Sequence, residues 1–158
     1  MSLKSDTLSQ IDSARKFFDR TTGIFEEKDG GFRATPESMS VVAQIAHTAH
    51  TIDWFREGAF QDRWRMDFQA MVAEMAKVET LSQARRLLAD AWDRLHRAVE
   101  GMAEEKLAEP MAENPIVGTR RRAYAVDGIV DHCAHHRGAL SVYARLVGKV
   151  PPMPYGDD

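Results

Sequence analysis

Apolar residues recur every three or four positions along most of the chain, and no stretch of useful length alternates between apolar and polar residues. The first spacing is typical of an amphipathic α-helix, whereas strict alternation would indicate a β-strand. The sequence therefore predicts an all-α protein. The apolar stripes predict long helices at about residues 7–18, 35–58, 80–99 and 124–147.

Capping residues indicate where several of these helices begin or end. Thr35 followed by Pro36 is typical of an N-cap and a first helical position, so we expect the second helix to begin there. Thr80 and Gln83 have the spacing of a capping box and predict the start of the third helix. Gly148 suits a left-handed C-terminal cap and predicts the end of the last helix.

The connections between the long helices are less regular. We expect a short helix at residues 67–77, and a loop at residues 104–122 because two prolines and a glycine interrupt that stretch. The final segment, KVPPMPYGDD, contains too much proline for a helix and is expected to lie extended across the bundle. Residues 1–158 are thus predicted to form a single domain, an up-and-down four-helix bundle with one extra short helix.

Length, charge and cysteine content narrow the class of protein. A chain of 158 residues can bury one core, and its net charge of −3 argues against nucleic-acid binding, which favours a basic surface. No apolar run approaches the roughly 20 residues that cross a bilayer, and residues 1–10 lack the apolar centre of a signal peptide. The single cysteine, Cys133, excludes an internal disulfide. We therefore expect a cytoplasmic protein without a membrane or nucleic-acid partner.

Histidines are concentrated in the last predicted helix, where DHCAHHRGAL contains three of the six in the chain. At 100° per residue, His132 and His136 share a face directed into the bundle, whereas His135 is expected to face outward. Side chains four residues apart have β-carbons about 5–6 Å from each other, so both imidazoles can bind one metal ion. The alternative is a buried histidine pair held by hydrogen bonds without a metal.

A third ligand would come from the second helix, where IAHTAHTIDWF contains His47 and His50. Both side chains project away from the main apolar face of that helix, which is centred on Ile45 and Ile52. A helix buried on two sides would bring either histidine into the protein. Helical geometry alone leaves both of them open as ligands.

The two histidine segments resemble motifs of a known family. DHCAHHRGALSVYARLVGKVPPMPYG resembles the C-terminal signature of the DinB-like (DinB/YfiT) superfamily of metal-binding four-helix bundles, in which two histidines separated by three residues precede Arg-Gly. IAHTAHTIDWFREGAF is similar to the earlier histidine-bearing helix of that family. The resemblance implies that His47, His132 and His136 bind the metal, with His50 as a neighbour. The chain departs from the commoner pattern at Ala139, where many members have glutamine.

The resemblance also implies a function. Three neutral imidazoles leave coordination positions open, as in catalytic rather than structural zinc sites, and they suit zinc, nickel, copper or iron. Characterised members include metal-dependent transferases that act on low-molecular-weight thiols. A metal-dependent thiol S-transferase, with nickel or zinc as its divalent ion, is therefore the leading hypothesis. The alternative is a non-catalytic, stress- or damage-inducible bundle whose metal is structural.

The resemblance further implies a homodimer, because members of the family commonly pair through their helices. One apolar cluster of helical spacing is expected either in the core or in this dimer contact: Trp64, Met66, Phe68, Met71 and Met75.

Several other residues have two interpretations. Asp53, Asp127 or Asp131 can orient a ligand histidine, although a solvated carboxylate is the simpler interpretation of each. Cys133 lies beside a predicted ligand but on the apolar face, which favours a small buried side chain over a nucleophile. The arginines at 120–122 form either an anion site or a solvated basic loop.

Overall fold

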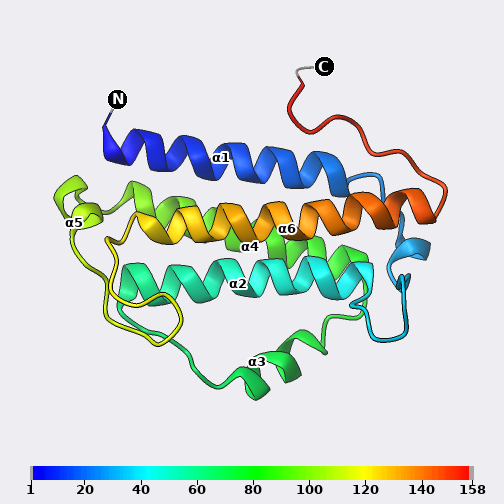
Figure 1. The fold of residues 1–158 in the computed structure, drawn as a ribbon, viewed down its shortest axis with the longest axis horizontal. Helices are drawn as coiled ribbons and strands as arrows, with labels where there is room; N and C mark the ends of the chain where they lie inside the picture. The colour runs from blue at the N-terminus through cyan, green and yellow to red at the C-terminus, as the bar shows by residue number, and fades with distance from the viewer. Residues whose placement is uncertain (1, 157–158) are drawn as a thin grey trace.

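The computed structural model describes residues 2–156, which contain six α-helices and one short 3₁₀-helix (Figure 1). The four long helices are α1 (Leu3–Thr22), α2 (Val41–Gln61), α4 (Leu81–Glu100) and α6 (Tyr124–Leu146). The short elements are η1 (Glu27–Asp29), α3 (Phe68–Met75) and α5 (Glu104–Ala108). The predicted all-α four-helix bundle is confirmed. None of the described helices combines the length and the apolar character that a membrane span requires.

The long helices form two pairs that run in opposite directions (Figure 1). α1 and α6 run one way, and α2 and α4 run the other. α2 and α4 share a direction because the chain leaves the end of α2 and returns through α3 to the end of the bundle where α2 began. This crossover departs from simple alternation at one connection and places α3 against α2.

The core lies where the apolar sides of the four long helices meet. Phe18, Ile45, Trp92 and Leu140 come one from each long helix, and none of them exposes more than 1% of its surface. Full burial of a side chain such as Phe18 or Ile45 stabilises the fold by about 1.5–3 kcal/mol. The helices pack as a bundle because only mutual contact removes these apolar stripes from water.

The start of α2 differs from the prediction. The helix begins at Val41 with Ser40 as its N-cap, whose hydroxyl accepts a hydrogen bond from the Ala43 N–H at 3.1 Å. Thr35 instead opens a turn, in which its carbonyl accepts a hydrogen bond from the Ser38 N–H at 3.1 Å. The prediction was wrong because proline after threonine suits the second position of a turn as well as the first position of a helix.

α1 is longer than the apolar stripe indicated. It begins at Leu3 because Ser2 caps it, with the Ser2 hydroxyl accepting a hydrogen bond from the Ser5 N–H at 3.2 Å. It continues to Thr22, whose hydroxyl donates to a carbonyl of the preceding turn. Caps and threonine side chains thus extend the helix beyond its predicted core-facing residues.

The structure corrects one predicted loop and confirms one predicted helix start. The stretch 104–122, predicted as a loop, contains α5, which buries Leu107 completely. The prolines of this stretch lie beyond α5 and so do not prevent a helical turn before them. The capping box at Thr80 and Gln83 is confirmed at the start of α4.

The C-terminal segment lies against α1 and α6 without helical structure, as predicted. Gly148 has a φ of +80°, the left-handed conformation expected after the last helix. The Tyr155 ring packs edge-on against Phe17 of α1, and its hydroxyl accepts a hydrogen bond from Arg137 of α6 at 2.7 Å. These contacts hold the described part of the tail on the bundle.

Candidate metal centre

Three histidines converge between α2 and α6. One ring nitrogen from each of His47, His132 and His136 lies within 4.8 Å of the other two. The Nε2 atoms of His47 and His132 are 3.1 Å apart. The structure therefore brings together the three residues that the sequence singled out, and it places His47, rather than His50, in the cluster.

The packing of α2 against α6 explains this convergence. His132 and His136 are one turn apart on the same face of α6, as the helical spacing predicted. The His47 ring from α2 packs against both, with ring centroids 4.9 Å from His132 and 5.0 Å from His136, so the three rings form a triangle. His135 is exposed, as predicted, although its ring packs edge-on against that of His136 with centroids 4.9 Å apart.

Gln44 orients one member of the cluster. Its side chain is buried, and its Oε1 atom lies 3.1 Å from Nδ1 of His136. An amide oxygen can only accept, so Nδ1 of His136 donates and its Nε2 keeps a free lone pair. Sequence reasoning missed Gln44, although a glutamine inside the apolar run VVAQIA, one turn before His47, is a usable signal.

The carboxylates considered for this orienting role lie elsewhere. Asp127 and Asp131 are exposed on α6. Asp53 is engaged by arginines, since it accepts hydrogen bonds from Arg94 at 3.0 and 2.6 Å and from Arg56 at 2.9 Å. The residue that holds a histidine of the cluster is therefore an amide rather than an acid.

Burial keeps the three imidazoles neutral. It lowers the pKa of His132 to about 3, with a further contribution from the neighbouring His136 and His47. Burial and the same kind of repulsion lower the pKa of His136 to about 4, and the pKa of His47 is also lowered. A neutral imidazole offers a lone pair to a metal ion, whereas an imidazolium cannot.

The donor set fits a borderline divalent cation. Two Nε2 atoms 3.1 Å apart share at most one proton, so at least one of them presents a lone pair toward the other. Nδ1 of His132 is buried without a hydrogen-bond partner, which indicates that the cluster is not a closed hydrogen-bond network. Zinc, nickel or copper is the kind of ion that such imidazole nitrogens bind.

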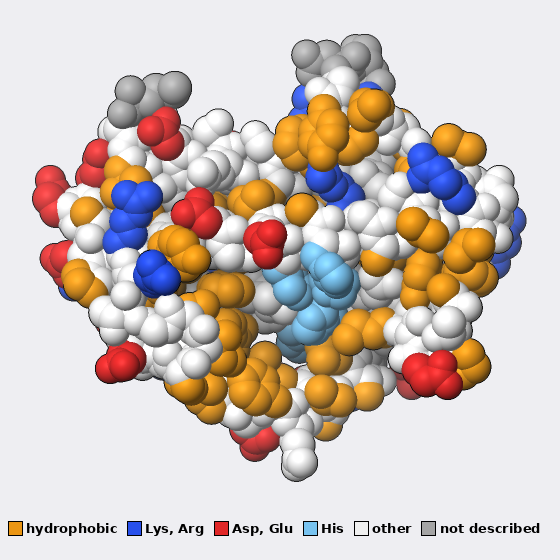
Figure 2. Space-filling view, in the orientation of Figure 1, with side chains coloured by type: hydrophobic (Ala, Val, Ile, Leu, Met, Phe, Trp, Pro, Cys, Tyr) orange, Lys and Arg blue, Asp and Glu red, His pale blue; other side chains and the backbone are white. Residues whose placement is uncertain are grey.

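Two pockets flank the cluster along α2. An apolar pocket of about 420 Å³ lies toward the start of the helix and includes Ala43, Val72 and Met75 in its lining. A polar pocket of about 150 Å³ lies toward its end and includes His50 and Trp54. Figure 2 shows that histidine side chains reach the surface in a hollow of this face, bordered by hydrophobic side chains. His47 and His132 are themselves partly exposed, so the candidate metal centre is accessible from solvent.

α3 forms the outer wall of both pockets and contributes little to the core. No residue of α3 is buried, and Met66 and Phe68 expose 40% and 47% of their surface. Trp64 and Met71 of the predicted apolar cluster are only partly buried. The prediction that the cluster lies in the core is therefore wrong for Met66 and Phe68.

Cys133 and Arg122 serve the fold. Cys133 is buried, and burial raises the pKa of its thiol to about 12, so it is no nucleophile. Arg122 is buried as well, and its guanidinium donates to both carboxylate oxygens of Asp62 at 2.9 Å and to the carbonyl of Ala59. The anion-site interpretation is therefore wrong for Arg122, which ties the start of α6 to the end of α2.

A comparison with protein families found a match over most of the chain. A family described as the DinB superfamily matches residues 10–140. This match includes both histidine-bearing segments. No curated protein matches the chain in sequence.

Solved structures share the fold. The chain is similar to a DinB-like protein from Bacillus subtilis, with a TM-score of 0.72 and 17% identity over 94% of this chain and 96% of that one. It is also similar to a conserved protein from Enterococcus faecalis, with a TM-score of 0.69 and 18% identity over 94% of this chain and 99% of that one. At these identities, the likeness shows the architecture only.

Proposed function

Because the chain belongs to the DinB superfamily, we propose that His47, His132 and His136 bind one divalent metal ion, nickel or zinc. We further propose that the site serves a transferase, or a related enzyme, that acts on a low-molecular-weight thiol and a second small molecule.

The convergence of the three ring nitrogens supports metal binding most directly. In a tetrahedral zinc site with bonds of about 2.0–2.1 Å, two ligand nitrogens lie roughly 3.3 Å apart. The separations in the cluster range from 3.1 Å to no more than 4.8 Å, so small rotations of the rings bring all three to a common ion. No fourth histidine, cysteine or carboxylate joins this cluster among the described residues.

An open site favours chemistry over a purely structural ion. Structural zinc sites have four protein ligands, whereas catalytic sites keep a position for water or substrate. A bound ion would supply a Lewis acid that favours the thiolate form of a coordinated thiol. The chain's own contribution is to hold His136 through Gln44, to keep the imidazoles neutral by burial, and to offer a pocket on either side.

Metal analysis of the purified protein tests the first part of the proposal. We expect about one equivalent of bound nickel or zinc in the wild type and a loss of that equivalent in His136→Ala. His135→Ala is the matched control, because His135 is adjacent but exposed, and it should retain the ion. Equal metal content in all three proteins would refute the proposed ligands.

Enzyme assays test the second part. The metal-loaded protein is mixed with a thiol and a chromogenic alkylating agent, and product formation is compared with His132→Ala and His135→Ala. We expect transfer to depend on His132 and not on His135. A bound metal without any metal-dependent transfer across a panel of small thiols would favour the structural alternative.

The proposal extends to location and assembly. A single cysteine with a buried thiol suits a reducing compartment, so we propose a cytoplasmic protein. We propose a homodimer that covers the exposed apolar side chains Met66, Phe68 and Val72. Light scattering of the purified wild type and of Val72→Glu gives the mass of each, and a monomeric wild type would contradict the dimer.

A further inference from the structure

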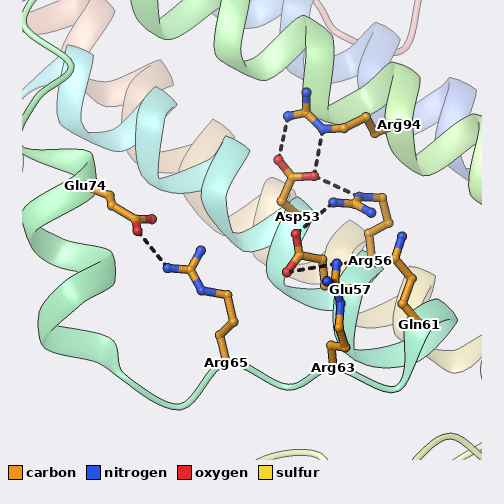
Figure 3. Close-up of polar contacts among 8 residues, drawn as sticks. All are labelled: Asp53, Arg56, Glu57, Gln61, Arg63, Arg65, Glu74 and Arg94. Atoms are coloured by element: carbon orange, nitrogen blue, oxygen red, sulfur yellow. Dashed lines mark hydrogen bonds and ion pairs between the residues drawn. The ribbon is translucent and has the colours of Figure 1, made fainter.

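The polar pocket beside the histidine cluster continues the face of α2 that carries His47. His50 and Trp54 follow His47 at three- and four-residue steps, so the three side chains lie along one stripe of the helix. The opposite wall comes from α3 and from the segment that leads to it (Figure 3). Seven residues line the pocket: His50, Asp53, Trp54, Glu57, Arg65, Met71 and Glu74.

The charges in this pocket divide into a fixed set and an available set. Asp53 accepts two hydrogen bonds from Arg94 and one from Arg56, and both arginines lie outside the pocket lining (Figure 3). Glu57 is also in contact with Arg56, at 3.1 Å, and remains 23% exposed. Asp53 is thus a structural carboxylate, whereas Glu57 has the capacity to accept further hydrogen bonds.

Arg65 and Glu74 face each other across the pocket. Their side chains form an ion pair at 2.8 Å, and they are 44% and 41% exposed (Figure 3). Exposed ion pairs contribute little to stability, so a ligand that carries both charges can replace this pair at small cost. One end of such a ligand would face Arg65, and the other would face the carboxylates.

Trp54 of the pocket and its neighbour Trp64 hold the backbone of Arg65 in place. The Trp54 indole N–H donates to the Arg65 carbonyl at 2.7 Å, and the Trp54 and Trp64 rings pack with centroids 4.5 Å apart. A residue whose backbone is already held loses less freedom when its side chain binds a ligand. His50 adds an unused group, because its Nε2 atom is buried without a hydrogen-bond partner.

The distance from the cluster sets the length of the ligand. Asp53 and Trp54 are six and seven residues beyond His47, which corresponds to about 10 Å along a helix. Free cysteine, with only two bonds between its sulfur and its α-carbon, is too short for this span. A thiol peptide of two or three residues can reach from the cluster to the pocket.

We propose that the polar pocket binds the free amino-acid end of a peptide thiol whose sulfur lies at the histidine cluster. The α-carboxylate pairs with Arg65, and the α-ammonium donates to Glu57 and Glu74. This inference rests on the proposed function, because it presupposes a thiol at the cluster. It narrows the substrate class to peptide thiols with a zwitterionic end about 10 Å from the sulfur.

Calorimetric titration of the zinc-loaded protein tests this assignment. The probes are glutathione, glutaryl-cysteinyl-glycine, which lacks the ammonium group, and γ-aminobutyryl-cysteinyl-glycine, which lacks the α-carboxylate. We expect glutathione to bind about tenfold more tightly than either analogue, since each analogue loses one charge-assisted contact. Equal affinities for the three thiols would overturn the inference.

Substitutions in the pocket test which residues produce the preference for glutathione. Arg65→Gln should weaken glutathione binding about tenfold and abolish the preference over the analogue without a carboxylate. Glu74→Gln should reduce the preference over the analogue without an ammonium group. Arg86→Gln is the matched control, because Arg86 is exposed on α4 and does not line the pocket. An equal effect of Arg65→Gln and Arg86→Gln would also overturn the inference.

Zinc content separates the two proposals. Each protein is analysed for bound zinc before titration, and the exposed substitutions should leave one equivalent in place. A wild type that binds neither zinc nor nickel would refute the proposed function. A zinc-loaded wild type that binds thiols without regard to their zwitterionic end would refute only the pocket assignment.

Discussion

α2 has two kinds of neighbour, and the difference between them separates rigid from adaptable parts of the site. Toward α4 and α6 it packs through fully buried side chains such as Ile45 and Ile52, and Gln44 and His47 meet the histidines of α6 there. Toward α3 it meets a helix without a single buried residue. Metal ligands need fixed geometry, whereas a pocket that admits a substrate benefits from a wall that can move.

The largest expected effect contrasts these two sides directly. Ile45→Ala should lower the free energy of unfolding by about 2–5 kcal/mol, because it leaves a cavity in the core. Gln69→Ala on α3 should change it by less than about 0.5 kcal/mol, since Gln69 is exposed. Urea denaturation of both variants measures the difference, and similar losses would show that α3 is part of the cooperative core.

Substitution of Gly58 tests how closely Trp64, in the segment that leads to α3, packs against α2. A β-carbon at this position would lie 2.1 Å from the Trp64 ring, so Gly58→Ala must displace Trp64 and should cost about 1–3 kcal/mol. Gly138→Ala is the control, because nothing lies within 4 Å of its added carbon. It should be neutral or stabilising by up to about 1 kcal/mol. Thermal unfolding distinguishes them, and equal stabilities would contradict the close approach.

Substitution of Gln44 tests the rigid side of the site, where α2 packs against α6. Gln44→Leu removes the acceptor for His136 Nδ1 and should weaken zinc binding about 10–100-fold. Gln44→Glu keeps an acceptor at the same place and should retain most of the affinity. Competition with a zinc chelator gives both constants. An unchanged affinity in Gln44→Leu would show that the ring orientation is set by packing alone.

Asp53 lies on α2 between the rigid side and the adaptable side, and its contribution to the free energy of unfolding should depend on pH. Burial raises the pKa of this carboxyl, but hydrogen bonds from Arg94 and Arg56 outweigh it, so the pKa is lowered in the folded protein. Its stabilisation is therefore fully present well above about pH 3.9, the unfolded value, and is lost as the pH falls toward the folded pKa.

Asp53→Asn measures this contribution. We expect the substitution to lower the free energy of unfolding by about 1 kcal/mol near neutral pH and by less below pH 4. Denaturation at several pH values measures this difference. Asp131→Asn, an exposed substitution on α6, should show no such trend. A difference between wild type and Asp53→Asn that grows on acidification would contradict the direction of the pKa shift.

Local patterns predicted most of the architecture. The helical class, the four long helices and the capping box of α4 follow from apolar spacing and from side chains that contact their own backbone, which are properties of neighbouring residues. The start of α2 was wrong because Thr35 and Pro36 suit a turn as well as a helix, and only the contacts of residues 35–38 decide between them. The crossover through α3 is likewise invisible in local spacing.

The sequence by itself determined that His132 and His136 lie together, because their four-residue spacing fixes their relative positions on any helix. Helical geometry could not choose between His47 and His50, since that choice depends on how α2 is rotated and shifted against α6, and only the family resemblance implied His47. The tertiary structure places His47 in the cluster, and only the tertiary structure brought Gln44 to His136 and Arg65 to Glu74. Such contacts arise from packing between segments far apart in the chain, which no local pattern encodes.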